Sequence, residues 1–269
     1  MPADRPRNPK PPAGESSQPS YVRHCFVLCE TEVPTGLSRA QQAVHSVFGP
    51  GYSARISEGN MVTVERGTEA IGFLAHVPAP IPNGEAEHNA AGNFLWKNGQ
   101  AEAARHRSHV IVANSGGGQP TPVQSALIVT RLALVALQIF DGLGVYWGNA
   151  SVSNSRAAFE DFCADISEEH LPLPVWLRYQ LVRSQAGGIG LYTLGMAQFD
   201  LMEIEVDHCR RDVQQLFEFV SNIAHYLIQN GPVIRDGNTV GGSPEERIVV
   251  RHLGSMIEQD RQVYKIVFE

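Results

Sequence analysis

Acidic residues recur at every second position in one short stretch of the C-terminal half. Glu203, Glu205 and Asp207 alternate with apolar residues over positions 201–207. This is the period of a β-strand, so we expect the three carboxylates on one face of it. Such a face could hold a divalent cation or supply a general acid and base. Because any strand with one wet face alternates in this way, we favour a solvated face. A negative patch for a basic partner and a metal or catalytic site are the alternatives.

A glycine-rich stretch, Ser115 to Gly118, lies between a predicted strand and a helix predicted to begin at Thr121. Backbone N–H groups in such a place can cradle a phosphate. The stretch has neither the Gly-Lys-Ser/Thr of a P-loop nor a Gly-x-Gly-x-x-Gly that opens the helix. We therefore interpret it as a flexible turn.

The common metal and nucleophile motifs are absent from the sequence. The chain has 10 histidines, but none are paired as His-x-x-x-His, and His106 and His109 are predicted to straddle a helix-to-strand junction. There is no Gly-x-Ser-x-Gly elbow, and Cys163 lies inside a predicted helix, which suits packing better than attack. The sequence thus predicts no catalytic residues, no metal site and no cofactor, and a protein that is not an enzyme.

Trp147 closes a short apolar run at a predicted strand edge. A large aromatic residue there can anchor an interface, although burial in the core is the commoner outcome. Trp147 is therefore a candidate anchor beside the acidic face.

These residues would be positioned by alternating strands and helices. Periodicity and breaker residues predict strands at 21–30, 54–65, 69–77, 109–114, 143–147, 175–184, 191–196, 201–207, 247–252 and 264–268. Helices are predicted at 35–48, 85–105, 121–140, 155–167 and 213–229. The opening order β-α-β-β-α-β resembles a ferredoxin-like unit. The expected fold class is α+β, with mixed, mostly antiparallel sheets and helices packed on one side, or two ferredoxin-like halves.

Composition narrows the class of protein. The chain has 269 residues, 43% hydrophobic and 18% charged, with a formal net charge of -7. This charge argues against nucleic acid or an anionic membrane as the main partner, since both require clustered cations. No signal peptide opens the chain, and the longest apolar stretch, 126–140, is too short to span a bilayer. We expect a soluble, cytoplasmic protein whose four cysteines are reduced and mostly buried.

The domain organisation is expected to be simple. Residues 1–20 are rich in proline, serine and charge, which predicts a disordered tail. Residues 21–269 are long enough for a single α+β domain, or for two packed lobes at about 21–107 and 108–269.

The C-terminal two-thirds, roughly residues 109–268, resembles a bacterial family of unknown function, catalogued as domain of unknown function 4261. No single segment is a catalytic motif, and the order of the segments carries the resemblance. They are 109–114 (HVIVAN), the helix from Thr121, 144–147 (GVYW), 173–175 (LPV), 190–196 (GLYTLGM), Phe199 with Glu203 and Glu205, 227–232 (LIQNGP), 236–239 (DGNT) and 263–264 (VY).

The resemblance implies a context rather than a site. Such proteins look like those encoded beside bacterial toxins, including type VI secretion effectors, which makes them candidate immunity proteins. The hypothesis is a protein that binds a cognate toxin, such as a nuclease, and blocks it sterically, with Glu203, Glu205, Asp207 and Trp147 as candidate contacts. An acidic inhibitor would complement a basic cleft. The alternatives are a hydrolase-like enzyme that uses the Gly-rich turn with the acidic strand, and a scaffold subunit.

Overall fold

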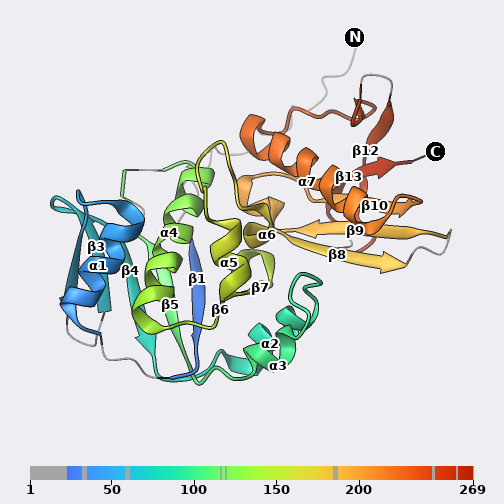
Figure 1. Cartoon of the computed structure of the whole chain (residues 1–269). Coiled ribbons are helices and arrows are strands. Elements are labelled where there is room, and N and C mark those ends of the chain that lie inside the picture. The colour runs from blue at the N-terminus through green and yellow to red at the C-terminus, as the bar shows by residue number, and fades with distance from the viewer. Residues whose placement is uncertain are drawn as a thin grey trace, which may run out of the picture.

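A computed structural model describes residues 23–31, 35–57, 61–115, 117–118, 120–183, 187–243, 246–258 and 260–268. The predicted N-terminal tail, residues 1–20, lies outside them. The described part is an α+β fold built on two mostly antiparallel sheets, as the sequence predicts (Figure 1). Each sheet is larger than the four strands of a ferredoxin-like unit.

The first sheet has seven strands in the order β2-β3-β4-β5-β1-β6-β7, and all of its pairs are antiparallel. The strands are β1 (His24–Cys29), β2 (Ser53–Ser57), β3 (Met61–Arg66), β4 (Glu69–Val77), β5 (Ser108–Asn114), β6 (Gly144–Trp147) and β7 (Val152–Ser155).

The second sheet has six strands in the order β11-β12-β13-β10-β9-β8, in which only the β10–β13 pair is parallel. The strands are β8 (Arg178–Arg183), β9 (Ile189–Leu194), β10 (Ile204–Cys209), β11 (Thr239–Val240), β12 (Ile248–Gly254) and β13 (Gln262–Val267).

Helices cover these sheets unevenly. They are α1 (Leu37–Phe48), α2 (Glu85–Ala91), α3 (Gly99–Ala103), α4 (Pro122–Phe140), α5 (Arg156–Phe162), α6 (Leu173–Trp176) and α7 (Val213–Asn230). In Figure 1, α1 and α4 lie side by side across one face of the first sheet, and α7 crosses the second sheet. The short helices α2 and α3 pack on the opposite face of the first sheet, where Trp96 contacts a small cluster that includes Leu28 and Tyr146.

Helix α4 is the centre of the main core. It begins with a reciprocal capping box, in which the Thr121 side chain accepts from the Gln124 backbone and the Gln124 side chain accepts from the Thr121 backbone. By length and composition α4 could cross a membrane, but 67% of its apolar window is buried inside the protein. This burial is what a core helix shows.

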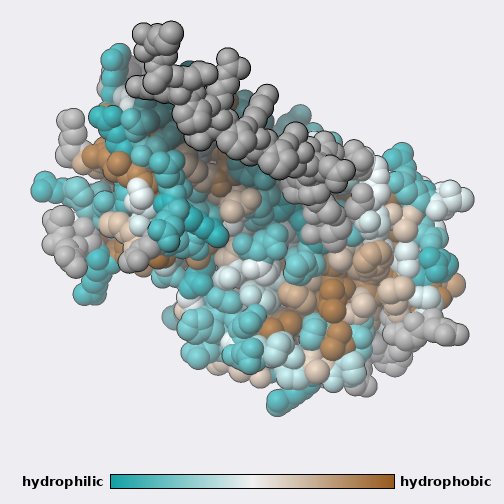
Figure 2. All heavy atoms as spheres, turned by 180° about the vertical axis from the view of Figure 1, so that it is seen from behind, coloured by the Kyte–Doolittle hydropathy of each residue, from teal (hydrophilic) through white to brown (hydrophobic). Residues whose placement is uncertain are grey.

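The face of the first sheet opposite α4 is only partly covered. Ile71, Phe73 and Ile111 are half-buried there, and they alternate with residues packed towards α4. Figure 2, the view from behind, shows hydrophobic atoms reaching the surface over this sheet.

Several predicted elements differ in detail. The helix expected at 155–167 already ends at Phe162, and the strand expected at 191–196 is β9. The expected strand 54–65 is the hairpin β2–β3, and the expected strand 175–184 begins as the short helix α6. The expected helix 85–105 is divided into α2 and α3, because glycine is a poor helix former and Gly99 packs where a Cβ would lie 2.7 Å from the Ala90 carbonyl oxygen. The acidic strand begins only at Ile204, after a left-handed residue at Asp200.

The boundary between the sheets falls between β7 and β8. The division suggested for two lobes, 21–107 and 108–269, does not coincide with it, because β5 begins at Ser108 and pairs with β1 and β4. One hydrophobic cluster contains residues of both sheets.

Candidate functional site

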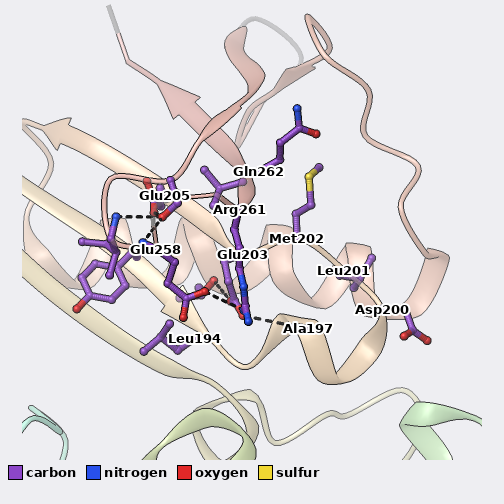
Figure 3. Close-up of a pocket in the computed structure, with 15 residues that line it drawn as sticks. Leu194, Ala197, Asp200, Leu201, Met202, Glu203, Glu205, Glu258, Arg261 and Gln262 are labelled. Atoms are coloured by element: carbon purple, nitrogen blue, oxygen red, sulfur yellow. Dashed lines mark hydrogen bonds and ion pairs between the residues drawn. The ribbon is translucent and has the colours of Figure 1, made fainter. Parts of the chain in front are cut away.

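A pocket of about 460 Å³ opens between the end of β9, the lead into β10 and the turn that joins β12 to β13 (Figure 3). Its apolar lining is aliphatic or thioether in character, apart from the ring of Tyr192. These residues are Leu194, Leu201, Met202, Ile257 and Val263. Its charged lining comprises Asp200, Glu203, Glu205, Glu258 and Arg261. Carboxylates therefore outnumber cations in this lining by four to one.

Glu203 is held by neutral donors. Its Oε2 accepts a hydrogen bond from Thr193 Oγ1 at 2.8 Å, and its Oε1 accepts from the backbone N–H groups of Gly195 at 2.8 Å and Ala197 at 3.4 Å. The Thr193 hydroxyl also accepts from the Ile204 N–H at 2.9 Å, so its own hydrogen is committed to Glu203. Burial raises the pKa of the Glu203 carboxyl, and these hydrogen bonds oppose the rise.

Glu205 is instead part of an ion-pair cluster. Lys265 Nζ lies 2.7 Å from Glu205 Oε2 and 2.6 Å from Asp207 Oδ1. The side chains of Lys265 and Glu205 are 6% and 4% exposed, whereas that of Asp207 is 47% exposed. Burial opposes the charge on both members of the buried pair, but the contacts with Lys265 prevail and lower the pKa of Glu205. Hydrogen bonds to both carboxylates likewise raise the pKa of Lys265.

Glu205 also secures the turn between β12 and β13. Its carboxylate accepts from the Ser255 hydroxyl and from the Met256 N–H, the latter at 3.2 Å. Ser255 Oγ in turn accepts the N–H groups of Ile257 and Glu258, each at 3.0 Å. With both its donor and its acceptor capacity used, the Ser255 hydroxyl is a structural group.

The turn that is secured in this way presents apolar side chains to solvent. Leu253, Met256 and Ile257 are 49%, 58% and 46% exposed. We call these three residues the apolar tip. It borders the pocket, because Ile257 lines it. The Arg261–Glu258 ion pair, at 2.8 Å, lines the same pocket.

The structure corrects the sequence interpretation of the acidic strand. Glu205 is not on a solvated face, because Lys265 of β13 stands directly opposite it and the β12–β13 turn bonds to its carboxylate. A charge reversal at Glu205 would therefore bring two buried cations together and test folding rather than a surface. Glu203 precedes β10 and lines the pocket, and only Asp207 has a largely open side chain.

Trp147 is not available as the interface anchor that was considered for it. Its side chain is 1% exposed, so it belongs to the core and cannot reach a partner's surface. The residues that sequence reasoning missed are Thr193, Ser255 and Lys265. One signal was available for the last of these, a single lysine within an otherwise apolar strand.

The remaining candidates do not join this site. The lining residues described come from positions 192–205 and 255–263, and so exclude the described part of the Gly-rich turn. Within the described residues, no group of three or more His, Cys, Asp or Glu could hold a metal ion. His106 is buried, with Nε2 accepting from the Ile81 N–H at 2.8 Å and Nδ1 placed 2.7 Å from the Ala103 carbonyl oxygen.

Comparison with known protein families gives a match in the C-terminal part of the chain. Residues 192–267 match the model of a family described as Domain of unknown function (DUF4261). This range is shorter than the resemblance at 109–268, but it contains every described residue that lines the pocket and the whole apolar tip. No curated protein matches the chain. No solved structure matches it either.

Proposed function

We propose that this chain is an immunity protein, which binds a co-encoded bacterial toxin and neutralises it by steric blocking. A nuclease delivered by type VI secretion is the toxin class we favour. The observation that carries the proposal is the apolar tip, three half-exposed hydrophobic side chains at the end of β12 and on the following turn, whose backbone is anchored to the buried Glu205.

A turn with this construction suits protein recognition. Apolar side chains that a partner can bury supply binding free energy, and a turn held by hydrogen bonds loses little conformational entropy on binding. In this chain the Ser255 hydroxyl and the Glu205 carboxylate supply those bonds. The apolar tip would therefore bind a partner in the conformation that it already has.

Charge supports the choice of partner. The chain carries a formal net charge of -7, and carboxylates predominate in the pocket beside the tip. A nuclease cleft is basic because it binds phosphates, so the two surfaces would attract each other and associate faster than neutral ones. The resemblance to a family that looks toxin-associated points the same way.

The test is co-purification. The tagged chain is expressed with its neighbouring genes, and the retained protein is identified and then expressed alone to measure killing. Stoichiometric retention of a neighbour that is toxic alone supports the proposal. Retention of no neighbour, with none of them toxic, would overturn it. A stable homo-oligomer without such a partner would favour the scaffold alternative, and turnover in a substrate screen would favour the hydrolase alternative.

Matched variants locate the surface. Met256→Asp combined with Ile257→Asp should weaken toxin binding by at least about 100-fold, since each buried apolar anchor contributes roughly 1–2 kcal/mol or more. Leu37→Asp is the control, because Leu37 is 56% exposed and lies on α1, the helix that covers the first sheet rather than the second. Equal losses in both variants would show that the tip is not the contact surface.

A further inference from the structure

Glu203 differs from its acidic neighbours in the pocket by its partners. Glu205 is paired with Lys265 and Glu258 with Arg261. Within the described residues, no Lys, Arg or His nitrogen lies within 4.0 Å of the Glu203 carboxylate, and the hydroxyl and backbone N–H groups that donate to it are neutral. Among the described residues, this partly buried carboxylate that faces a pocket thus has no cationic partner within 4.0 Å.

An organic cation would match this environment. A carboxylate withdrawn from water is costly until a positive charge or strong donors approach it. Thr193, Gly195 and Ala197 already use three of the about four acceptor sites that the two carboxylate oxygens offer. A guanidinium or ammonium group could use the site that remains.

The apolar walls of the pocket favour an aliphatic chain in the part of the ligand that is attached to the cationic group. Leu194, Met202 and Val263 are apolar and line the same pocket as Glu203. The methylene stems of lysine and arginine pack on such surfaces while the charged end reaches a polar partner. A volume of about 460 Å³ lies within the range of small-ligand pockets and is ample for one such side chain.

We propose that this pocket binds an aliphatic cation, namely a lysine or arginine side chain presented by the partner protein, with its charged end at Glu203. The inference rests on the proposed function for the source of the cation, because the apolar tip beside the pocket is where a protein partner would already be docked. An anionic ligand is disfavoured by the four carboxylates of the lining. The guanidinium of Arg261, which lines the same pocket, is paired with Glu258.

The test uses the chain alone and small probes. n-Butylguanidinium and n-butylammonium are titrated against the ¹⁵N-labelled chain, with 1-pentanol as the neutral probe of similar length. The Gly195 and Ala197 amides report directly, because both donate to Glu203. We expect saturable shifts of these two amides with the cations, and at least about 10-fold weaker binding of pentanol.

Glu203→Gln should abolish the cation preference while pentanol still binds, which would show that the pocket remains folded. Glu218→Gln, an exposed position on α7, is the matched control and should bind like the unmodified chain. Equal binding of cation and alcohol, or cation binding unchanged in Glu203→Gln, would overturn the proposal.

Further outcomes distinguish a failure of this inference from a failure of the proposed function. If the cations bind but no toxic neighbour co-purifies, the pocket assignment stands and the immunity function falls. If a toxic neighbour co-purifies equally with Glu203→Gln, the immunity function stands and the pocket assignment falls. Tighter binding of free spermidine than of a capped lysine peptide, by 10-fold or more, would overturn the choice of a protein as the source.

Discussion

The indole of Trp147 and the side-chain amide of Gln198 are hydrogen-bonded across the junction of the two sheets, with Trp147 Nε1 donating to Gln198 Oε1 over 3.1 Å. The same oxygen accepts from Arg23 Nη1 at 3.0 Å. The Gln198 Nε2 donates to the carbonyl oxygens of Trp176 and Gly195, each at 2.8 Å. One amide thus joins β6 to the turn that follows β9, and this turn carries the donors to Glu203.

Gln198→Leu should destabilise the protein by about 2–4 kcal/mol, because the buried indole N–H loses its acceptor and the Trp176 carbonyl loses its side-chain donor. The free energy of unfolding is measured by urea denaturation. Gln214→Leu on the exposed face of α7 is the control and should change stability by less than about 0.5 kcal/mol. Equal stability of the two variants would show that the amide does not join the sheets.

Lys265→Met should cost about 3–5 kcal/mol, since it leaves the buried Glu205 carboxylate without its cation. Adding Glu205→Gln to Lys265→Met removes the unpaired charge and should restore part of the loss. The measurement is a double-mutant cycle by chemical denaturation. A double variant that is less stable than Lys265→Met would contradict this account.

The limits of sequence reasoning are visible in that pair. Thr121 with Gln124, and the amphipathic pattern of α7, are local signals, and both elements form as predicted. Glu205 and Lys265 are opposed because β10 and β13 pair in parallel in one particular register. Local periodicity does not encode which distant strands become neighbours, so it could not distinguish a buried ion pair from a wet acidic face.

The candidate site, too, could be predicted from the sequence only in part. The sequence places Glu203 among the acidic candidates, but the pocket forms only when the segment after β9 meets the β12–β13 turn. Trp147 was ambiguous between core and surface, and its short strand gave no means of choosing. Its burial follows from the packing of the two sheets. The centroids of the Trp147 and Trp176 rings lie 6.5 Å apart there.

His109 should make stability depend on pH in the mildly acidic range. Burial lowers its pKa below the ordinary value of 6.5, although its bond to the Ala79 carbonyl oxygen opposes this. The unfolded chain then binds a proton more readily than the folded one, so stability is lost as pH falls through 6.5. His109→Gln should flatten this part of the pH profile, measured as the melting temperature between pH 5 and 8. A variant profile parallel to that of the unmodified chain would exclude His109 as the cause.

The cysteines should resist alkylation until the protein unfolds. All four are free and buried. Burial raises the pKa of the Cys29 and Cys163 thiols to about 12, so almost no thiolate exists at pH 8. Labelling by iodoacetamide, followed by mass spectrometry, should then be slow in buffer and complete in denaturant, with a rate set by opening of the core. Introducing Ser243→Cys at a surface position provides a thiol that should react at once. Cys25, Cys29, Cys163 and Cys209 all belong to the main hydrophobic cluster, so a native cysteine that reacted as fast as this control would contradict the prediction.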